Sequence, residues 1–200
     1  MSRTSTLELA AAAARLVVEE GMEYAAAKRR AARDLRIRGE LPGNEEVEDA
    51  VREYLAVFCA DTQPAELRAL RELARVWMER LQAFRPHLAG AVWRGTATRL
   101  SALHLELYCD DSKSAELALI DKGVDYDVTV LDRPGGGEPL SVLSLASPCA
   151  ALGEPVTLHL KIHDRDDLRG ALKPDARGRT WRGDLDALRR LLDAEPGDAA

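Results

Sequence analysis

The 200-residue sequence is poor in cysteine and in aromatic residues, and each scarcity excludes a class of protein. Its three cysteines, Cys59, Cys109 and Cys149, are far apart and form no Cys-x-x-Cys pair. This spacing argues against a zinc ribbon and against a secreted disulfide framework. Aromatic residues make up 4% of the chain, so a hydrophobic core must be built mainly from alanine, leucine and valine.

Long uncharged apolar runs are also lacking. Glu8, Glu19 and Glu20 interrupt the apolar N-terminal region, which therefore does not read as a signal segment. No other apolar run approaches the length needed to cross a membrane. A net charge of −6 weighs against a general nucleic-acid coat. We therefore expect a cytoplasmic, bacterial-type protein with no membrane partner.

The sequence has none of the common short motifs for nucleotide or ester chemistry. It contains no G-x-x-x-x-G-K-[ST] phosphate loop and no G-x-G-x-x-G unit between a strand and a helix. A G-x-S-x-G nucleophile elbow is missing as well. The sequence therefore does not support ATP binding through a phosphate loop or a dinucleotide-binding unit, and it does not support hydrolysis by a serine on a nucleophile elbow.

The pattern of the chain predicts an α+β protein in two parts. Apolar residues at helical spacing and capping residues predict four helices, at 6–20, 23–35, 44–58 and 64–84. After them we expect five strands, at 89–93, 103–109, 124–131, 140–145 and 156–164, with helices at 112–122, 167–172 and 184–194. The predicted organisation is an N-terminal helical region (1–86), a mixed five-stranded sheet with flanking helices (87–195) and a frayed tail (196–200).

The run from Leu103 to Cys109 alternates apolar and polar residues with a period of two, which predicts a strand with one buried face. His104 and Glu106 would lie together on its other face, where the pair could chelate one ion. The later strands alternate in the same way, so this face is either the floor of an active site or ordinary exposed surface. The pattern alone leaves both interpretations open.

Around this strand the chain resembles the nucleotidyltransferase superfamily, which has the polymerase-β-like fold. The family signature is an apolar strand, Gly-Ser, a linker, a strand bearing Asp-x-Asp or Asp-x-Glu, and a third carboxylate on a later strand. Here Gly95-Thr96 is taken as the Gly-Ser, and residues 101–107, SALHLEL, stand where the family commonly reads Ser-Asp-Ile-Asp-Leu-x-x. The third carboxylate is either Asp127 or Asp164. The resemblance covers about residues 88–164.

The resemblance implies binding of a nucleoside triphosphate and transfer of its nucleotidyl group to an RNA or protein acceptor. It places Gly95 and Thr96 on the phosphates, and it places His104, Glu106 and Asp110 in catalytic positions. His104 and Glu106 would hold Mg²⁺ or Mn²⁺ in place of the family's paired aspartates. An imidazole ligand favours manganese over magnesium at such a site.

Two basic stretches are further candidates for phosphate contact. The loop 173–182, KPDARGRTWR, offers Arg177 and Arg179 to a nucleotide, or it is a solvated loop whose Trp181 packs on the domain. The stretch 28–38 either pairs with the acidic helix at 45–53 or binds RNA.

Three hypotheses follow from the sequence. The chain is a metal-dependent nucleotidyltransferase, a catalytically inactive module of the same fold that binds a nucleotide or RNA, or a helical scaffold for a partner protein. Metal-dependent binding of a nucleoside triphosphate separates the first hypothesis from the other two.

Overall fold

The computed structural model describes residues 3–132, 139–169, 173–175 and 178–194. It divides into two compact units. Met1–Leu67 and Thr96–Ser101 form the helical unit, and Arg68–Gly95 and Ala102–Ala200 form the sheet unit. The division into a helical region at 1–86 and a sheet domain at 87–195 remains a prediction.

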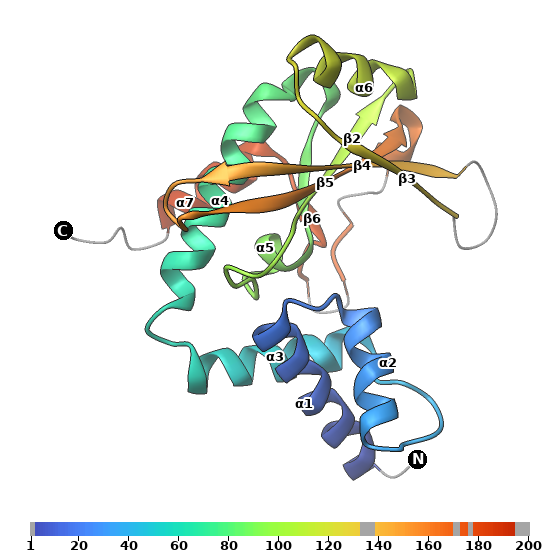
Figure 1. The fold of residues 1–200 in the computed structure, drawn as a ribbon, viewed down its shortest axis with the longest axis vertical. Helices are drawn as coiled ribbons and strands as arrows, with labels where there is room; N and C mark the ends of the chain where they lie inside the picture. The colour runs from blue at the N-terminus through green and yellow to red at the C-terminus, as the bar shows by residue number, and fades with distance from the viewer. Residues whose placement is uncertain (1–2, 133–138, 170–172, 176–177, 195–200) are drawn as a thin grey trace. The chain divides into compact units, whose positions relative to one another are not determined.

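The helical unit contains α1 (Arg3–Glu20), α2 (Tyr24–Asp34), α3 (Asn44–Phe58) and the first turn of α4 (Gln63–Arg80) (Figure 1). Its core consists of small and branched aliphatic side chains, as the low aromatic content predicts: Leu9, Ala13, Ala14, Val17, Val18, Ala27, Ala31, Val47, Val51 and Leu55. The four predicted N-terminal helices are therefore present. α3 begins with a capping interaction in which the Gly43 amide donates to the Glu46 carboxylate at 2.7 Å.

The segment Thr96–Ser101 belongs to the helical unit although it follows the first strand of the sheet unit. The Gln63 side chain donates to the Ala97 carbonyl at 2.8 Å, and the Arg99 amide donates to the Glu66 carboxylate at 2.9 Å. Gly21, between α1 and α2, has φ +65, and a Cβ there would lie 2.7 Å from the Leu100 carbonyl oxygen. Only glycine allows this close approach.

The sheet unit is built on a six-stranded mixed sheet with the order β3-β4-β5-β2-β1-β6 (Figure 1). The strands are β1 (His87–Ala89), β2 (Leu103–Cys109), β3 (Asp127–Leu131), β4 (Leu140–Cys149), β5 (Glu154–Asp164) and β6 (Arg182–Gly183). β2 runs parallel to β5, and the other neighbouring strands are antiparallel. The predicted α+β class and the mixed sheet are confirmed, with six strands in place of five.

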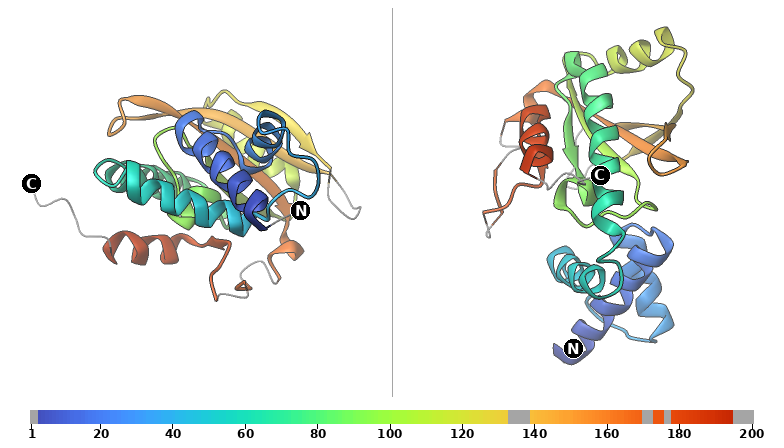
Figure 2. Two further views of the ribbon diagram at one scale, coloured as in Figure 1. Left: turned by 90° about the horizontal axis from the view of Figure 1, so that it is seen from below. Right: turned by 90° about the vertical axis from the view of Figure 1, so that its left-hand side faces the viewer.

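One side of the sheet is the apolar face predicted from the alternation in β2. Leu103, Leu105 and Leu107 are fully buried. α4 packs on this side, where the Trp77 indole donates to the Ser147 hydroxyl of β4 at 2.9 Å. α7 (Leu185–Ala194) lies beside α4 (Figure 2), where Arg189 donates to the Glu79 carboxylate at 3.0 Å and Arg68 donates to the Leu192 carbonyl at 3.3 Å.

The predicted strand at 89–93 is wrong, because the chain turns into a short helix. β1 ends at Ala89, and α5 (Gly90–Arg94) follows at once. Gly90 has φ +70, a conformation that ends the strand. The buried Arg71 side chain then donates to the Val92 carbonyl at 3.1 Å and to the Trp93 carbonyl at 3.3 Å, which satisfies the end of the helix.

The remaining helices are α6 (Ser112–Asp121) and α7, with short 3-10 turns η1 (Gln82–Phe84) and η2 (Arg165–Leu168). Aspartates at 111, 164 and 184 accept hydrogen bonds from the first-turn amides of α6, η2 and α7, at 2.8–2.9 Å. Among the described residues, no helix is both long enough and apolar enough to span a bilayer.

Candidate functional site

All four histidines of the chain lie on one face of the sheet. His104 pairs with His159 across β2 and β5, and His87 on β1 pairs with Glu106. His163 pairs with Tyr108, so these side chains project to the same side. We call this side the histidine face and define it by His87, His104, Glu106, Tyr108, His159, Lys161, His163 and Arg182.

The face is a packed polar layer. The His104 and His159 rings stack with centroids 5.1 Å apart, and the Tyr108 and His163 rings stack at 5.2 Å. Glu106 and Tyr108 are buried. Of the two interpretations left open by the sequence, ordinary exposed surface does not describe the part of the face around these two residues.

The Glu106 carboxylate is the centre of this layer. Arg182 donates to its Oε2, and the Tyr108 hydroxyl donates to the same oxygen at 3.2 Å. Arg182 also donates to the Tyr108 hydroxyl at 2.6 Å, and His163 Nε2 lies 3.5 Å from Glu106 Oε2. A charged hydrogen bond and a neutral one therefore already occupy Oε2, one of the two carboxylate oxygens that Glu106 could offer to a metal ion.

Burial and the neighbouring Glu106 charge raise the pKa of Tyr108 to about 12. The hydroxyl therefore remains protonated at neutral pH and can donate to Glu106 while it accepts from Arg182. Tyr108 thus connects the two charged groups and does not act as a base.

His87 is buried at the edge of this layer and gives it a dependence on pH. Burial is the main cause that lowers the His87 pKa below its usual 6.5, and the Arg182 charge acts in the same direction. Below about pH 6.5 the His87 side chain therefore binds a proton more readily in the unfolded chain than in the folded one. The free energy of unfolding falls as the pH drops below this value.

We expect the urea midpoint of the wild-type protein to fall more between pH 7.5 and pH 5.5 than that of His87→Gln, because the variant lacks this proton linkage. Tryptophan fluorescence measures it, since Trp77, Trp93 and Trp181 all belong to the sheet unit. Equal losses in the two proteins would contradict the assignment. The other three histidines are present in both proteins and cancel in the comparison.

The glycine beside His104 is Gly90. A Cβ at Gly90 would lie 3.1 Å from His104 Cδ2, so the missing side chain leaves room for the imidazole. Along the chain, the apolar strand β1 is thus followed by a glycine corner at Gly90 and then by β2, which has polar residues on one face. The signature of the superfamily resembles this order.

Gly95 and Thr96, predicted as the phosphate corner, lie elsewhere. Gly95 ends α5 with φ 79, and this helix separates it from Gly90 by roughly 7 Å along the axis. Thr96 belongs to the helical unit, where it is buried and its Oγ1 lies 3.5 Å from the Tyr24 hydroxyl. The structure therefore does not place the Thr96 hydroxyl on the histidine face.

The predicted carboxylates are dispersed as well. Asp110 has a side chain that is 73% exposed and pairs with Arg165 at 3.1 Å. Asp164 accepts from the Asp166 amide and caps η2. Asp127 is exposed on β3, in register with Ser144 of β4, which is in turn in register with His159.

The basic loop is held to the sheet unit by Asp175. This buried carboxylate lies 3.3 Å from the Arg179 guanidinium and 3.5 Å from that of Arg94. The Arg94 guanidinium stacks 4.4 Å from the Trp181 ring, so Trp181 packs on the domain. The charge of Arg179 is thus already compensated, and Arg177 lies outside the described residues.

His104 and Glu106 do not fit a site for two divalent ions. Glu106 is held by Arg182 and Tyr108, and Mg²⁺ prefers free oxygen ligands over imidazole. In the part of the chain that the structure describes, no group of three or more histidine, cysteine or acidic side chains is placed to hold a metal ion.

Sequence reasoning missed Gly90, Lys161 and Arg182. Lys161 has a visible signal, since it alternates with apolar residues on β5 beside two histidines. Gly90 has one also, because a glycine inside an apolar run indicates a bend or a close approach of the backbone. Arg182 has none, because its contact with Glu106 joins positions 76 residues apart.

No family model matches the chain, and no curated protein matches it. Among solved structures, the Cid1 poly(U) polymerase with MgGTP is similar at 17% identity and TM-score 0.37, over 64% of this chain and 44% of that one. Cid1 with the UTP analogue UMPNPP has 17% identity and TM-score 0.35, over 65% and 43%. A cytoplasmic RNA terminal U-transferase has 20% identity and TM-score 0.33, over 58% and 37%.

The chain thus spans less than half the length of these matched chains. At such TM-scores the likeness does not assign their reaction to this protein. The resemblance to the nucleotidyltransferase superfamily is therefore carried by the residues alone, the SALHLEL stretch and the glycine corner beside His104.

Proposed function

We propose that this chain is a nucleotidyltransferase-like protein that binds the phosphates of a nucleoside triphosphate on the histidine face, beside Gly90. The observation that carries the proposal is the close approach of Gly90 to His104, where a Cβ would lie 3.1 Å from the imidazole. The missing side chain lets the imidazole pack against the backbone of this corner, which fixes His104 on the histidine face where a phosphate would meet it.

Lys161 supplies the positive charge for this site. It lies in register with Glu106 on the histidine face and is only partly buried. Within the described residues its ammonium group makes no ion pair or hydrogen bond, whereas Arg182 is held by Glu106. A phosphate oxygen would therefore meet the Lys161 ammonium, with the His104 and His159 imidazoles as hydrogen-bond partners.

Nucleotidyl transfer to an RNA or protein acceptor is the reaction that the resemblance implies. In the family, Mg²⁺ or Mn²⁺ supplies the charge stabilisation for this transfer. In this chain the imidazoles and Lys161 would bind and orient the triphosphate. Arg182 and Tyr108 would fix Glu106 below it. The contact of Arg177 with the nucleotide remains a prediction. The cytoplasmic location of the protein also remains a prediction.

A second candidate is a module of the same fold that binds a nucleotide without transferring it. The observation that favours it is the engagement of Glu106 by Arg182 and Tyr108, because both compete with an ion for this carboxylate. The two candidates share the binding site and differ only in turnover.

Calorimetric titration with the four nucleoside triphosphates tests the binding site, first in EDTA and then with Mg²⁺ or Mn²⁺. We expect binding in EDTA that weakens about tenfold in Lys161→Gln, because one charge-assisted contact is worth roughly 1.5 kcal/mol. Gly90→Ala should also weaken it, whereas Gly123→Ala should not. Gly123 has φ +63 with open space around it, so this control carries the backbone strain alone.

Release of pyrophosphate with Mn²⁺ and an RNA acceptor then separates the two candidates. Pyrophosphate release supports the transferase, and binding without release supports the module. A folded protein that binds none of the four nucleotides would refute both.

A further inference from the structure

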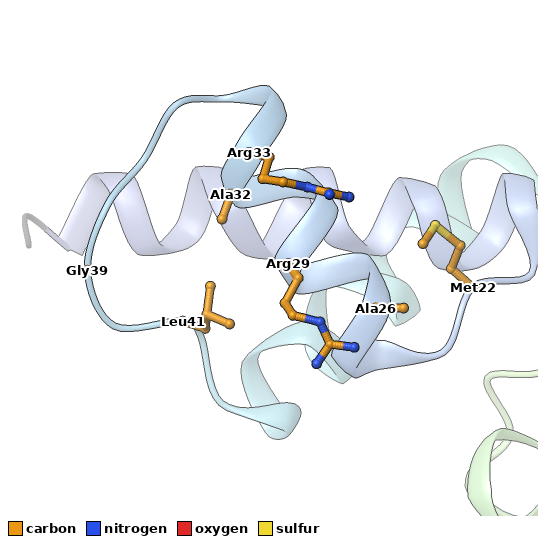
Figure 3. A pocket seen from close by; sticks show the side chains of 7 residues that line it. All are labelled: Met22, Ala26, Arg29, Ala32, Arg33, Gly39 and Leu41. Atoms are coloured by element: carbon orange, nitrogen blue, oxygen red, sulfur yellow. The ribbon is translucent and has the colours of Figure 1, made fainter.

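The helical unit has a pocket of its own. A hollow of about 580 Å³ opens between α2 and the segment that leads to α3. Its lining is formed by Met22, Ala26, Arg29, Ala32, Arg33, Gly39 and Leu41. Figure 3 shows Arg29 and Arg33 between Leu41 at one end and Met22 at the other. The volume lies within the range of small-molecule sites.

Two arginines in this lining have no carboxylate to neutralise them. Arg29 and Arg33 are one helical turn apart, and neither guanidinium group makes an ion pair or a hydrogen bond within the described residues. The pairing of this basic stretch with the acidic helix α3, favoured by the sequence, is therefore wrong for both. Their neighbour Arg30 is different, because it pairs with Glu20 and Asp34 on α1 and α2.

The cationic character continues beyond the pocket. Residues 28–38 contain six basic residues and one acidic residue. Arg36 and Arg38 are exposed, and their side chains also have no partner among the described residues. Lys28 is fixed, since it donates to the Pro42 carbonyl at 3.1 Å and to the Asn44 side chain at 2.8 Å. This contact fixes the loop that closes the hollow, and it leaves the arginines exposed.

We propose that this arginine pocket binds the phosphate group of a nucleotide, at a site separate from the histidine face. Two guanidinium groups can hold one phosphate by paired hydrogen bonds. The apolar side chains of Met22, Ala26 and Leu41 line the space beside them and suit the face of a base. An inorganic anion would use the charge but not the apolar lining.

The nucleotide has two possible sources, a free mononucleotide or one unit of a single-stranded RNA. Arg36 and Arg38 would contact further phosphates only in the second case. The pocket does not require the proposed function of the sheet unit, because all of its residues belong to the helical unit.

Two titrations in EDTA test the proposal, one by calorimetry with AMP and one by fluorescence anisotropy with a labelled 12-nucleotide RNA. We expect Arg29→Gln/Arg33→Gln to weaken binding at this site at least tenfold and to lower the salt dependence of RNA binding. Arg15→Gln is the matched control. It removes a charge from the same unit, but Arg15 pairs with Glu19 and lies outside the pocket.

A third variant tests the apolar part of the pocket. Ala26→Leu keeps both arginines and fills the hollow, so we expect it to weaken AMP binding while Arg15→Gln does not. If the histidine face also binds AMP, the stoichiometry should fall from two to one in the double variant. A failure of the histidine face would instead leave one site that the double variant abolishes.

The outcomes identify the source. Tighter binding of RNA than of AMP indicates a chain of phosphates on Arg36 and Arg38, and comparable binding indicates a free nucleotide. Unchanged affinity of both probes in the double variant would overturn the proposal. An equal loss in Arg15→Gln, or binding of neither probe, would overturn it as well.

Discussion

Replacing Glu106 with alanine is expected to reduce the free energy of unfolding of the sheet unit by about 3 kcal/mol. The loss arises because Arg182 and the Tyr108 hydroxyl both donate to this buried carboxylate. Removing it leaves a guanidinium and a hydroxyl in the polar layer without their acceptor. Urea unfolding followed by tryptophan fluorescence reports on this unit, because all three tryptophans belong to it.

Asp110→Ala is the matched control for this prediction. Asp110 was also predicted as a catalytic carboxylate, but its side chain is 73% exposed. We expect its urea midpoint to remain at the wild-type value. If Glu106 were instead a free metal ligand, Glu106→Ala measured in EDTA would leave the free energy of unfolding unchanged or would raise it. That outcome would contradict the role of Glu106 as the centre of the layer.

Replacing Gly183 with alanine is expected to cost about 3 kcal/mol through overpacking. A Cβ at Gly183 would lie 2.0, 2.3 and 2.6 Å from three ring atoms of Trp93. The indole cannot move away easily, because its Nε1 donates to the Thr180 carbonyl at 3.0 Å. β6 pairs with β1 through Gly183 and Arg182, so displacement of this strand also moves Arg182 away from Glu106.

Gly153→Ala provides the comparison. Gly153 has φ +70 and open space around it, so alanine there should cost only the backbone strain of about 1 kcal/mol. In a Trp93→Leu background, Gly183→Ala should cost much less than in the wild-type protein, because the ring that it meets is gone. Far-UV circular dichroism during urea unfolding measures the wild-type protein and all four variants. An equal cost in both backgrounds would show that contact with Trp93 is not the cause.

Local patterns were sufficient to predict most of the fold. The alternation in Leu103–Cys109 identified β2 and the side on which His104 and Glu106 lie. The aspartate before the last helix, Asp184, identified the start of α7. These predictions succeeded because a cap or a period of two depends on residues a few positions apart.

The errors in the predicted fold and the gaps in the predicted site have a different physical origin. The run 89–93 is apolar enough for a strand, but the positive φ of Gly90 and the carbonyls bound by Arg71 make it a helix. β6 is only two residues long, too short for any periodicity. The contacts of Arg71 and Arg182 join distant parts of the chain, and no local pattern encodes them.

The histidine imidazoles offer the most direct measurement of the proposed nucleotide site. The chain has four histidines, and all of them lie on the histidine face. We predict that ATP in EDTA shifts the ring ¹H–¹⁵N correlations of His104 and His159 in a saturable way, and that Lys161→Gln weakens the response. If all four histidines keep their positions at saturating ATP while the protein remains folded, the nucleotide does not bind on this face.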